Sequence, residues 1–396
     1  MISAFRKQFN DNYSPEKYQR FLAMLDEMCL THIQFRPCET PMFLPEALVK
    51  TLEKSSVEII AQLMNNSAYL KKSADAIPDK YNVPNETPHP LFLQIDFGLV
   101  DDGAGNIIPK LIELQAFASM YMYQVAMVET YKKAYQLDAR LSPFFGALEM
   151  EEYLAIMRKA FLGEHSAENV VLMEIEPYKQ KTLPDFLLTQ HYFDITPVDI
   201  SSIKKEGKKL FYQRNGKWTP IHRIYNRTIV DELERKNIIP PFDFRDELEV
   251  EWADHPNWFF RISKFSIPYL QHPSVPQSIF LNEIKTLPDD LHNYVLKPLF
   301  SFAGAGVIVE PTYEDVMCIA ENEKANFILQ EKVTYKPVVE TPFGGTKAEV
   351  RCMFVWQEKL MPVLFLVRMG RGKQMGVDFN KNMEWVGSSA GLYFRE

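Results

Sequence analysis

A strand–loop–strand pattern between residues 293 and 309 constrains this chain more than any other segment. An apolar run ending at Lys297 is followed by a turn of small residues and then by a second apolar run. Small residues allow backbone N–H groups to approach an anion closely, and the lysine places a positive charge at the end of the first strand. The pattern predicts a loop that closes over phosphate groups, although a β-hairpin turn containing glycine fits the segment equally well.

This loop differs from two common phosphate-binding motifs. It contains neither GxxxxGK[ST] nor GxGxxG, and no helix is expected directly after it. Its contacts with a bound phosphate would therefore come mainly from the backbone of the small residues. The residues of the loop that we expect to bind a nucleotide are Ser301, Ala303, Gly304 and Gly306, together with Lys297.

A second informative segment is a predicted β-hairpin, with strands at 91–100 and 107–117 joined by a turn at 101–106. Alternate residues of a strand share a face, so Glu113 and Gln115 point the same way and Asp96 can lie across from them. Two carboxylates and an amide oxygen on one face suit a Mg²⁺ ion that bridges phosphates. The alternative is a solvated polar face, but the apolar neighbours of Asp96 leave little room for one.

Lysine and arginine residues supply the positive charge that a phosphate site needs. Lys264 and Lys297 would together neutralise part of a triphosphate, although a lone lysine is more often a surface residue. Arg223 and Arg227 share a face if their stretch is helical, and Arg351 is one of several arginines near the end of the chain. Arginine makes bidentate contacts with carboxylates and phosphates, but each of these arginines alone is more often a surface or structural residue.

A predicted strand at 327–333 ends in polar residues. Gln330, Glu331, Lys332 and Val333 could present backbone groups to the edge of an adenine ring. A strand that simply ends in charged residues at the rim of a sheet is equally common, so this segment alone does not decide between the two interpretations.

Composition and charge exclude several classes of protein. The chain has 396 residues and a net charge of −8, so nothing indicates a general nucleic-acid binder. No apolar run is long enough to span a bilayer, and the first residues lack the apolar core of a secretory signal. The four cysteines form no CxxC pair, which argues against a cysteine metal site. We expect reduced thiols in a cytoplasmic protein.

The secondary-structure pattern divides the chain into three units. Residues 1–165 combine predicted helices at 12–35, 45–72 and 119–162 with the acidic hairpin. Residues 166–255 read as a small α/β layer with a strand–helix–strand sequence at 169–200 and a hairpin at Asn215-Gly216. Residues 256–396 are rich in predicted strands, with helices near 312–324. The expected fold class is mixed α+β or α/β.

The order of these segments resembles the ATP-grasp superfamily, and in particular its circularly permuted branch, which includes glutathionylspermidine synthase-like proteins. Lys264 in SKF, the step Val275-Pro276, Lys297 in VLKP with its small-residue loop, and Gln330-Glu331 follow one another as in the family. The acidic hairpin precedes them, as it does in the permuted branch. The stretch RIYNR at 223–227 resembles an element that this branch carries between its two halves.

The resemblance implies a permuted ATP-grasp fold with an N-terminal helical segment, a Rossmann-like pre-ATP-grasp unit at 166–255 and a nucleotide-binding half at 256–396. It also implies a ligase that joins a small-molecule carboxylate to an amine through an acylphosphate, with ATP and Mg²⁺ as cofactors. In this resemblance Mg²⁺ would be bound by Asp96, Glu113 and Gln115, and the phosphates by Lys264 and Lys297. The adenine would be contacted by residues Gln330 to Val333. The acylphosphate would be oriented by Arg223, Arg227 or Arg351.

The chain departs from the family pattern at two positions. Gln115 stands where the branch usually has asparagine, and Gln94 stands where an arginine commonly precedes the first acidic residue by two. An ATP-binding module without ligase activity is therefore an alternative, and a scaffold protein with no nucleotide is a third. The identity of the acid and the amine and the oligomeric state stay open.

Overall fold

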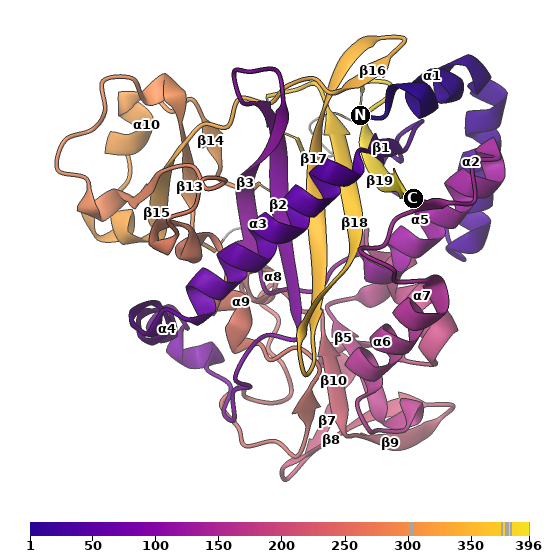
Figure 1. Cartoon of the computed structure of the whole chain (residues 1–396). Coiled ribbons are helices and arrows are strands. Elements are labelled where there is room, and N and C mark those ends of the chain that lie inside the picture. The colour runs from indigo at the N-terminus through magenta and orange to yellow at the C-terminus, as the bar shows by residue number, and fades with distance from the viewer. Residues whose placement is uncertain (301–303, 374, 377–379, 381, 396) are drawn as a thin grey trace.

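The computed structural model describes the chain except for residues 301–303, 374, 377–379, 381 and 396. It has a mixed α+β architecture built around one large sheet (Figure 1). Within the described residues this sheet has eight strands in the order β1-β19-β18-β17-β2-β3, with β16 paired to β17 and β4 paired to β19. Their bounds are Met42–Leu44 (β1), Phe92–Asp101 (β2), Ile107–Gln115 (β3), Leu141–Ser142 (β4), Val339–Thr341 (β16), Gly344–Trp356 (β17), Leu360–Gly370 (β18) and Gly387–Phe394 (β19).

The predicted acidic hairpin is confirmed as β2 and β3. The two strands pair antiparallel with Asp96 opposite Glu113 and Gln94 opposite Gln115, and the register shifts between Asp96 and Phe97. All of β2 except its last residue is buried, because the strand lies inside the sheet between β17 and β3. Leu93, Ile95, Phe97 and Leu99 belong to an apolar core on one face, and the buried polar residues Gln94 and Asp96 alternate with them.

Helices cover both faces of the large sheet. Helix α3 (Glu46–Met64) lies across one face (Figure 1), where its buried leucines and isoleucines meet the apolar side chains of β2, β17 and β18. Part of the other face packs against α5 (Tyr121–Tyr135), which in turn packs on α2 (Pro15–Met28) and α7 (Leu183–Phe193). The remaining helices are α1 (Ser3–Asn12), α4 (Ser67–Ala74), α6 (Met150–Leu162), α8 (Val230–Arg235), α9 (Asn257–Arg261) and α10 (Tyr313–Met317).

The second predicted unit contains a parallel sheet and a separate antiparallel sheet. The strand–helix–strand prediction is confirmed, because β5 (Val170–Glu174), α7 and β6 (Thr196–Asp199) form a parallel pair with a crossover helix. The parallel sheet has the order β11-β10-β5-β6, with β10 at Arg223–Asn226 and β11 at Glu251–Trp252. The predicted hairpin turn joins β8 (Lys209–Arg214) to β9 (Lys217–Ile221), and β7 (Lys204–Glu206) pairs with β8.

A small sheet in the order β12-β15-β13-β14 lies beside the edge strand β3 of the large sheet (Figure 1). Its strands are β12 (Ser278–Phe280), β13 (Tyr294–Pro298), β14 (Ile308–Val309) and β15 (Phe327–Glu331). Strands β13 and β14 pair antiparallel, so the strand–loop–strand prediction is confirmed. Gly304 and Gly306 in the loop have positive φ, a conformation that glycine adopts without strain. Ser301 and Ala303 lie outside the described residues.

Three helix predictions are corrected. The helix expected at 12–35 is present as the shorter α2, which begins at Pro15 because Ser14 caps the backbone of Lys17 and proline suits a first helical turn. The helix expected at 45–72 is broken into α3 and α4, where Asn66 caps the second helix. The helical patterning at 119–162 contains the strand β4 between α5 and α6, and α5 ends at Gln136 in a left-handed conformation.

The segment predicted as one nucleotide-binding half, 256–396, is divided between two sheets. Strands β12 to β15 form the small sheet, whereas β17 to β19 join the acidic hairpin in the large sheet. The pattern of alternating apolar residues indicates that a segment is a strand, but it does not say which sheet the strand joins. None of the described helices is long and apolar enough to cross a membrane.

Candidate functional site

A polar cluster lies on one face of the large sheet, where the strand register places its members in rows. Arg351 on β17 pairs directly with Asp96 on β2, and Asp96 pairs with Glu113 on β3. In the next row Glu349 on β17 pairs with Gly98 on β2 and with Arg368 on β18. Directly paired residues share a face of the sheet. The register therefore fixes acidic and basic side chains beside each other.

Asp96 is enclosed by two arginines. Arg351 contacts both carboxylate oxygens, with Nε 2.5 Å from Oδ1 and Nη2 2.7 Å from Oδ2, and Arg368 also donates to Oδ2. Burial alone would raise the pKa of Asp96, but the two guanidinium groups outweigh this effect and hold the pKa below its ordinary value. Asp96 is therefore a buried carboxylate with both oxygens engaged.

Glu349 is a second buried carboxylate of the cluster. Arg368 lies 3.0 Å from it, and the hydroxyl of Tyr335 donates to it. Gly98 makes room for the Tyr335 ring, because a Cβ atom at this position would lie 2.6 Å from the ring. Burial raises the pKa of Glu349, the nearby Asp96 raises it further, and Arg368 opposes the rise.

Two lysines from other elements reach β3 beside this cluster. The Nζ atom of Lys264, in the 3-10 segment Lys264–Tyr269, lies 2.9 Å from Oε1 of Glu113. The Nζ atom of Lys297, on β13 of the small sheet, donates to the carbonyl of Ile112 at 2.9 Å. The pKa of Lys297 is lowered to about 8, mainly by burial, with a contribution from the nearby Lys264 that Glu113 opposes. The structure thus brings both predicted lysines to the predicted acidic hairpin.

Hydrogen bonds through two glutamines extend the cluster toward Arg227. Gln94 accepts from Gln115 at 2.9 Å and from Nη1 of Arg351 at 2.9 Å, and it donates to the carbonyl of Ser119 at 2.7 Å. The Ser119 hydroxyl lies 3.4 Å from Nη2 of Arg227. The structure therefore connects Arg227 to the cluster through Ser119.

Arg227 is buried in an aromatic environment. Its guanidinium group lies 4.6 Å from the ring centre of Phe117 and 5.6 Å from that of Phe186. Among the described residues its Nε and Nη1 atoms have no hydrogen-bond partner. A buried guanidinium with unused donors is costly, and a carboxylate or phosphate is the ligand that would satisfy it.

Arg223 lies elsewhere in the structure. It belongs to the strand β10 rather than to a helix, and it donates to the carbonyls of Ala160 and Phe161 at 2.9 Å each. These carbonyls end helix α6, and Arg223 also pairs with Glu251 on β11. Arg223 thus satisfies the end of a helix. The structure does not bring it to the polar cluster.

The strand predicted to contact adenine is β15, which pairs with β12 and β13. Gln330 is buried between these strands, and among the described residues its Nε2 atom has no hydrogen-bond partner. Glu331 is exposed, and Val333 is half-buried. Lys332 pairs with Glu310 at 3.0 Å, and Glu310 also pairs with Lys373 at 2.7 Å. These ion pairs connect the small sheet to the loop after β18.

The donor set of the cluster does not fit the predicted Mg²⁺ site. Both oxygens of Asp96 face arginine, and Glu113 faces Lys264. In the part of the chain that the structure describes, no group of three or more histidine, cysteine, aspartate or glutamate side chains is arranged to hold a metal ion. The magnesium prediction for Asp96, Glu113 and Gln115 stays a prediction, and no chemical step is derived from it.

Glu349 and Tyr335 were not predicted to belong to the site, and Arg368 was predicted only as one of several arginines near the end of the chain that could bind a carboxylate or phosphate. The spacing of Glu349 and Arg351 was an available signal, because residues two apart in a strand share a face. Arg368 could not be placed in the same way, since its neighbour on the face comes from another strand.

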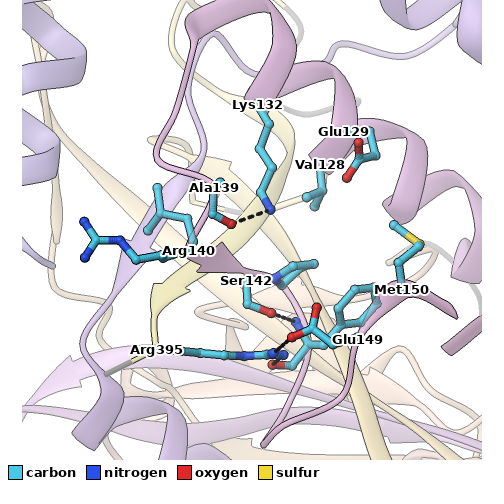
Figure 2. A pocket seen from close by; sticks show the side chains of 12 residues that line it. Val128, Glu129, Lys132, Ala139, Arg140, Ser142, Glu149, Met150 and Arg395 are labelled. Atoms are coloured by element: carbon cyan, nitrogen blue, oxygen red, sulfur yellow. Dashed lines mark hydrogen bonds and ion pairs between the residues drawn. The ribbon is translucent and has the colours of Figure 1, made fainter. Parts of the chain in front are cut away.

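A cavity of about 340 Å³ lies away from these residues (Figure 2). It is formed by the end of α5, the strand β4, the loop that leads to α6 and the last residues of the chain. Lys132 points toward the carbonyl of Ala139, and Arg395 pairs with Glu149 across the cavity. None of the described residues that were predicted to bind nucleotide lines it.

Comparison with known proteins gives a likeness in fold. No protein-family model and no curated protein matches the sequence. Among solved structures, the chain is similar to a glutathione synthetase-like effector from Globodera pallida in its apo form, with a TM-score of 0.62 and 9% sequence identity. The match covers 97% of this chain and 98% of that one. At this identity the likeness concerns the mixed α+β fold alone.

Proposed function

We propose that this protein is an ATP-dependent ligase that joins a carboxylate to an amine. The observation that carries the proposal is the meeting of Lys264 and Lys297 on β3, at Glu113 and Ile112, from two separate elements. The motif order in the sequence and the likeness to a glutathione synthetase-like structure support the same class of enzyme. The likeness concerns the fold alone, so the activity rests on the side chains.

The proposed nucleotide site lies between the small sheet and β3. Lys264 and Lys297 contact the phosphates, and the loop around Gly304 and Gly306 covers them with backbone N–H groups. The end of β15, residues 330–333, contacts the adenine. Among the described residues the Nε2 atom of Gln330 has no hydrogen-bond partner, which is consistent with a polar ligand at this strand.

The proposed reaction has two steps. An oxygen of the substrate carboxylate attacks the γ-phosphorus of ATP, which forms an acylphosphate and releases ADP. The amine nitrogen then attacks the acyl carbon, which forms the amide, loses a proton and releases phosphate. The contribution of the protein is to position the reactants and to stabilise the negative charge that develops on the transferred phosphoryl group.

Arg351 and Arg227 are the arginines proposed to hold the acyl substrate. Arg351 lies in the cluster itself, and Arg227 is connected to it through Ser119 and Gln94. Among the described residues the Nε and Nη1 atoms of Arg227 have no hydrogen-bond partner, so this guanidinium group has donors available for a carboxylate oxygen. Arg223 is left out of the proposal, since it lies at the end of α6 and not at the polar cluster.

The experiment that tests this proposal is a coupled assay of ADP release. The purified protein is incubated with ATP, a panel of carboxylic acids that includes amino acids and short peptides, and a panel of amines, with and without added Mg²⁺. Release of ADP that requires both an acid and an amine, and that is lost in Lys297→Met, would support the ligase.

An ATP-binding module without ligase activity is the alternative. The enclosure of Asp96 by Arg351 and Arg368 favours it, because this carboxylate has no oxygen left for catalysis. Tight ATP binding without ADP release over the whole panel would favour the module over the ligase.

A further inference from the structure

The polar cluster carries more basic than acidic side chains. Its acidic members are Asp96, Glu113 and Glu349, and its basic members are Lys264, Lys297, Arg351 and Arg368. A group with an excess of positive charge attracts an anion and repels a free divalent cation. The charge balance is therefore the reverse of that in a site built from carboxylates to hold magnesium.

The sheet holds the arginines in place. Arg351 is the direct cross-strand partner of Asp96, and Arg368 is the direct partner of Glu349. Neither guanidinium can leave the face of the sheet without abandoning a buried carboxylate. Removing one partner of a buried ion pair costs several kcal/mol, so a magnesium ion would have to compensate this loss in order to bind Asp96.

The other two carboxylates are engaged as well. Glu113 pairs with Lys264, and Glu349 accepts from Tyr335 and pairs with Arg368. The raised pKa of Glu349 lowers its tendency to carry the negative charge that a metal ligand needs. The amide of Gln115 donates to Gln94, so it is oriented by this hydrogen bond.

We propose that this cluster binds the phosphate chain of the nucleotide directly through its lysines and arginines, without a divalent cation that bridges the phosphates to the protein. The inference rests on the proposed function, since it concerns the same nucleotide. Lysine and arginine can supply the charge stabilisation that a metal ion supplies elsewhere. The ligand class is a free nucleoside triphosphate rather than its magnesium complex.

The test compares the affinity of the full-length protein for ATP in EDTA with its affinity in excess Mg²⁺, by isothermal titration calorimetry. The inference predicts that the dissociation constant in EDTA is within about fivefold of the value in Mg²⁺ or lower. Binding that is seen only with Mg²⁺ would overturn the inference and leave the nucleotide site in place. Absence of ATP binding in both conditions would overturn the proposed function as well.

A double variant tests whether the anion sits at this cluster. Arg368→Met together with Glu349→Gln removes one guanidinium group without leaving a charged Glu349 unpaired and without changing the net charge of the cluster. The affinity for ATP in EDTA should fall at least about tenfold, because a direct contact with phosphate is lost. Arg245→Met, at the exposed pair with Asp243, is the matched control and should bind ATP like the wild type. Thermal unfolding reports whether each variant is folded. If the double variant is not folded, the affinity of Lys297→Met for ATP in EDTA is compared with that of the wild type instead. Wild-type affinity in a folded variant would overturn the inference.

Discussion

Lys264 and Lys297 reach neighbouring residues of one strand, although they belong to different elements of the chain. Lys264 pairs with Glu113 at 2.9 Å, and Lys297 donates to the carbonyl of Ile112 at 2.9 Å. Lys297 comes from the small sheet, so its contact joins the two sheets at the edge strand β3. Two cations held at this junction are the basis of the proposed phosphate site.

Lys297→Met should stabilise the free protein while it removes ATP binding. The fall of the lysine pKa from 10.5 to about 8 corresponds to roughly 3 kcal/mol of unfavourable burial at neutral pH. Loss of the hydrogen bond to Ile112 lowers the stability of the variant by about 1 kcal/mol. The net free energy of unfolding, measured by urea denaturation, should therefore rise by about 2 kcal/mol.

The gain in stability of Lys297→Met over the wild type should depend on pH. Between about pH 8 and pH 10.5 the unfolded wild-type chain binds more protons at Lys297 than the folded protein does, so wild-type stability rises with pH and the advantage of methionine shrinks. Lys133→Met, at an exposed position of α5, is the control and should change little. A loss of stability in Lys297→Met below pH 8 would show that burial of this lysine is not a cost.

Arg351→Met should destabilise the protein strongly. The substitution leaves Asp96 buried with one guanidinium instead of two, and breaking a buried ion pair costs about 3 kcal/mol or more. Arg245→Met removes a bidentate pair of the same type, with Asp243 at the surface, and should destabilise the protein far less. Chemical denaturation of both variants gives the comparison, and equal losses would mean that the Asp96 cluster is not a buried network.

Arg223→Met should mainly lower stability, whereas Arg227→Met should mainly lower activity. Arg223 holds the end of α6, so its loss should lower the free energy of unfolding by about 2 kcal/mol and leave ligase activity per folded molecule unchanged. Arg227 has unused buried donors, so its loss should affect turnover or the KM for the acid much more than stability. The measurements are urea denaturation and ADP release. Loss of activity in a folded Arg223→Met variant would contradict this assignment and would show that Arg223 belongs to the proposed site.

Glu174→Gln should be more stable than the wild type, and the difference in stability should be larger at alkaline than at acid pH. Burial raises the pKa of Glu174 to about 8, although Arg227 opposes the rise. Between pH 4.5 and about 8 the folded protein therefore binds a proton that the unfolded chain has lost, and wild-type stability falls as the pH rises.

The glutamine variant does not titrate at this position. Its stability advantage over the wild type should be small near pH 4.5 and reach about 5 kcal/mol above pH 8, because each unit of pKa corresponds to about 1.4 kcal/mol. Denaturation curves across this range measure the effect, with Glu168→Gln at an exposed neighbouring position as the control. An advantage that does not change with pH would contradict the assignment of the titration to Glu174.

Local patterns in the sequence predicted the elements that carry the site. The alternation around Asp96 and Glu113 predicted the hairpin, and the small residues after Lys297 predicted the strand–loop–strand. In both cases the signal lies within a short stretch of chain, where strand periodicity and turn chemistry decide the structure.

Contacts between distant segments could not be predicted in this way. Asp96 and Arg351 are 255 residues apart, and their pairing depends on β17 lying next to β2 in the sheet. The role of Arg223 depends on where α6 ends beside β10. A residue type and its spacing indicate what a side chain can bind, whereas its partner follows from the order of strands and the packing of helices.

The affinity for ATP of wild type, Lys264→Met, Lys297→Met and the control Lys133→Met, measured by isothermal titration calorimetry, tests the central claim most directly. We predict that the wild type and the control bind ATP alike and that each of the other two variants binds at least about tenfold more weakly, because each loses a charged contact with phosphate. Equal affinity in all four folded proteins, or no ATP binding by the wild type, would contradict a nucleotide site at these lysines.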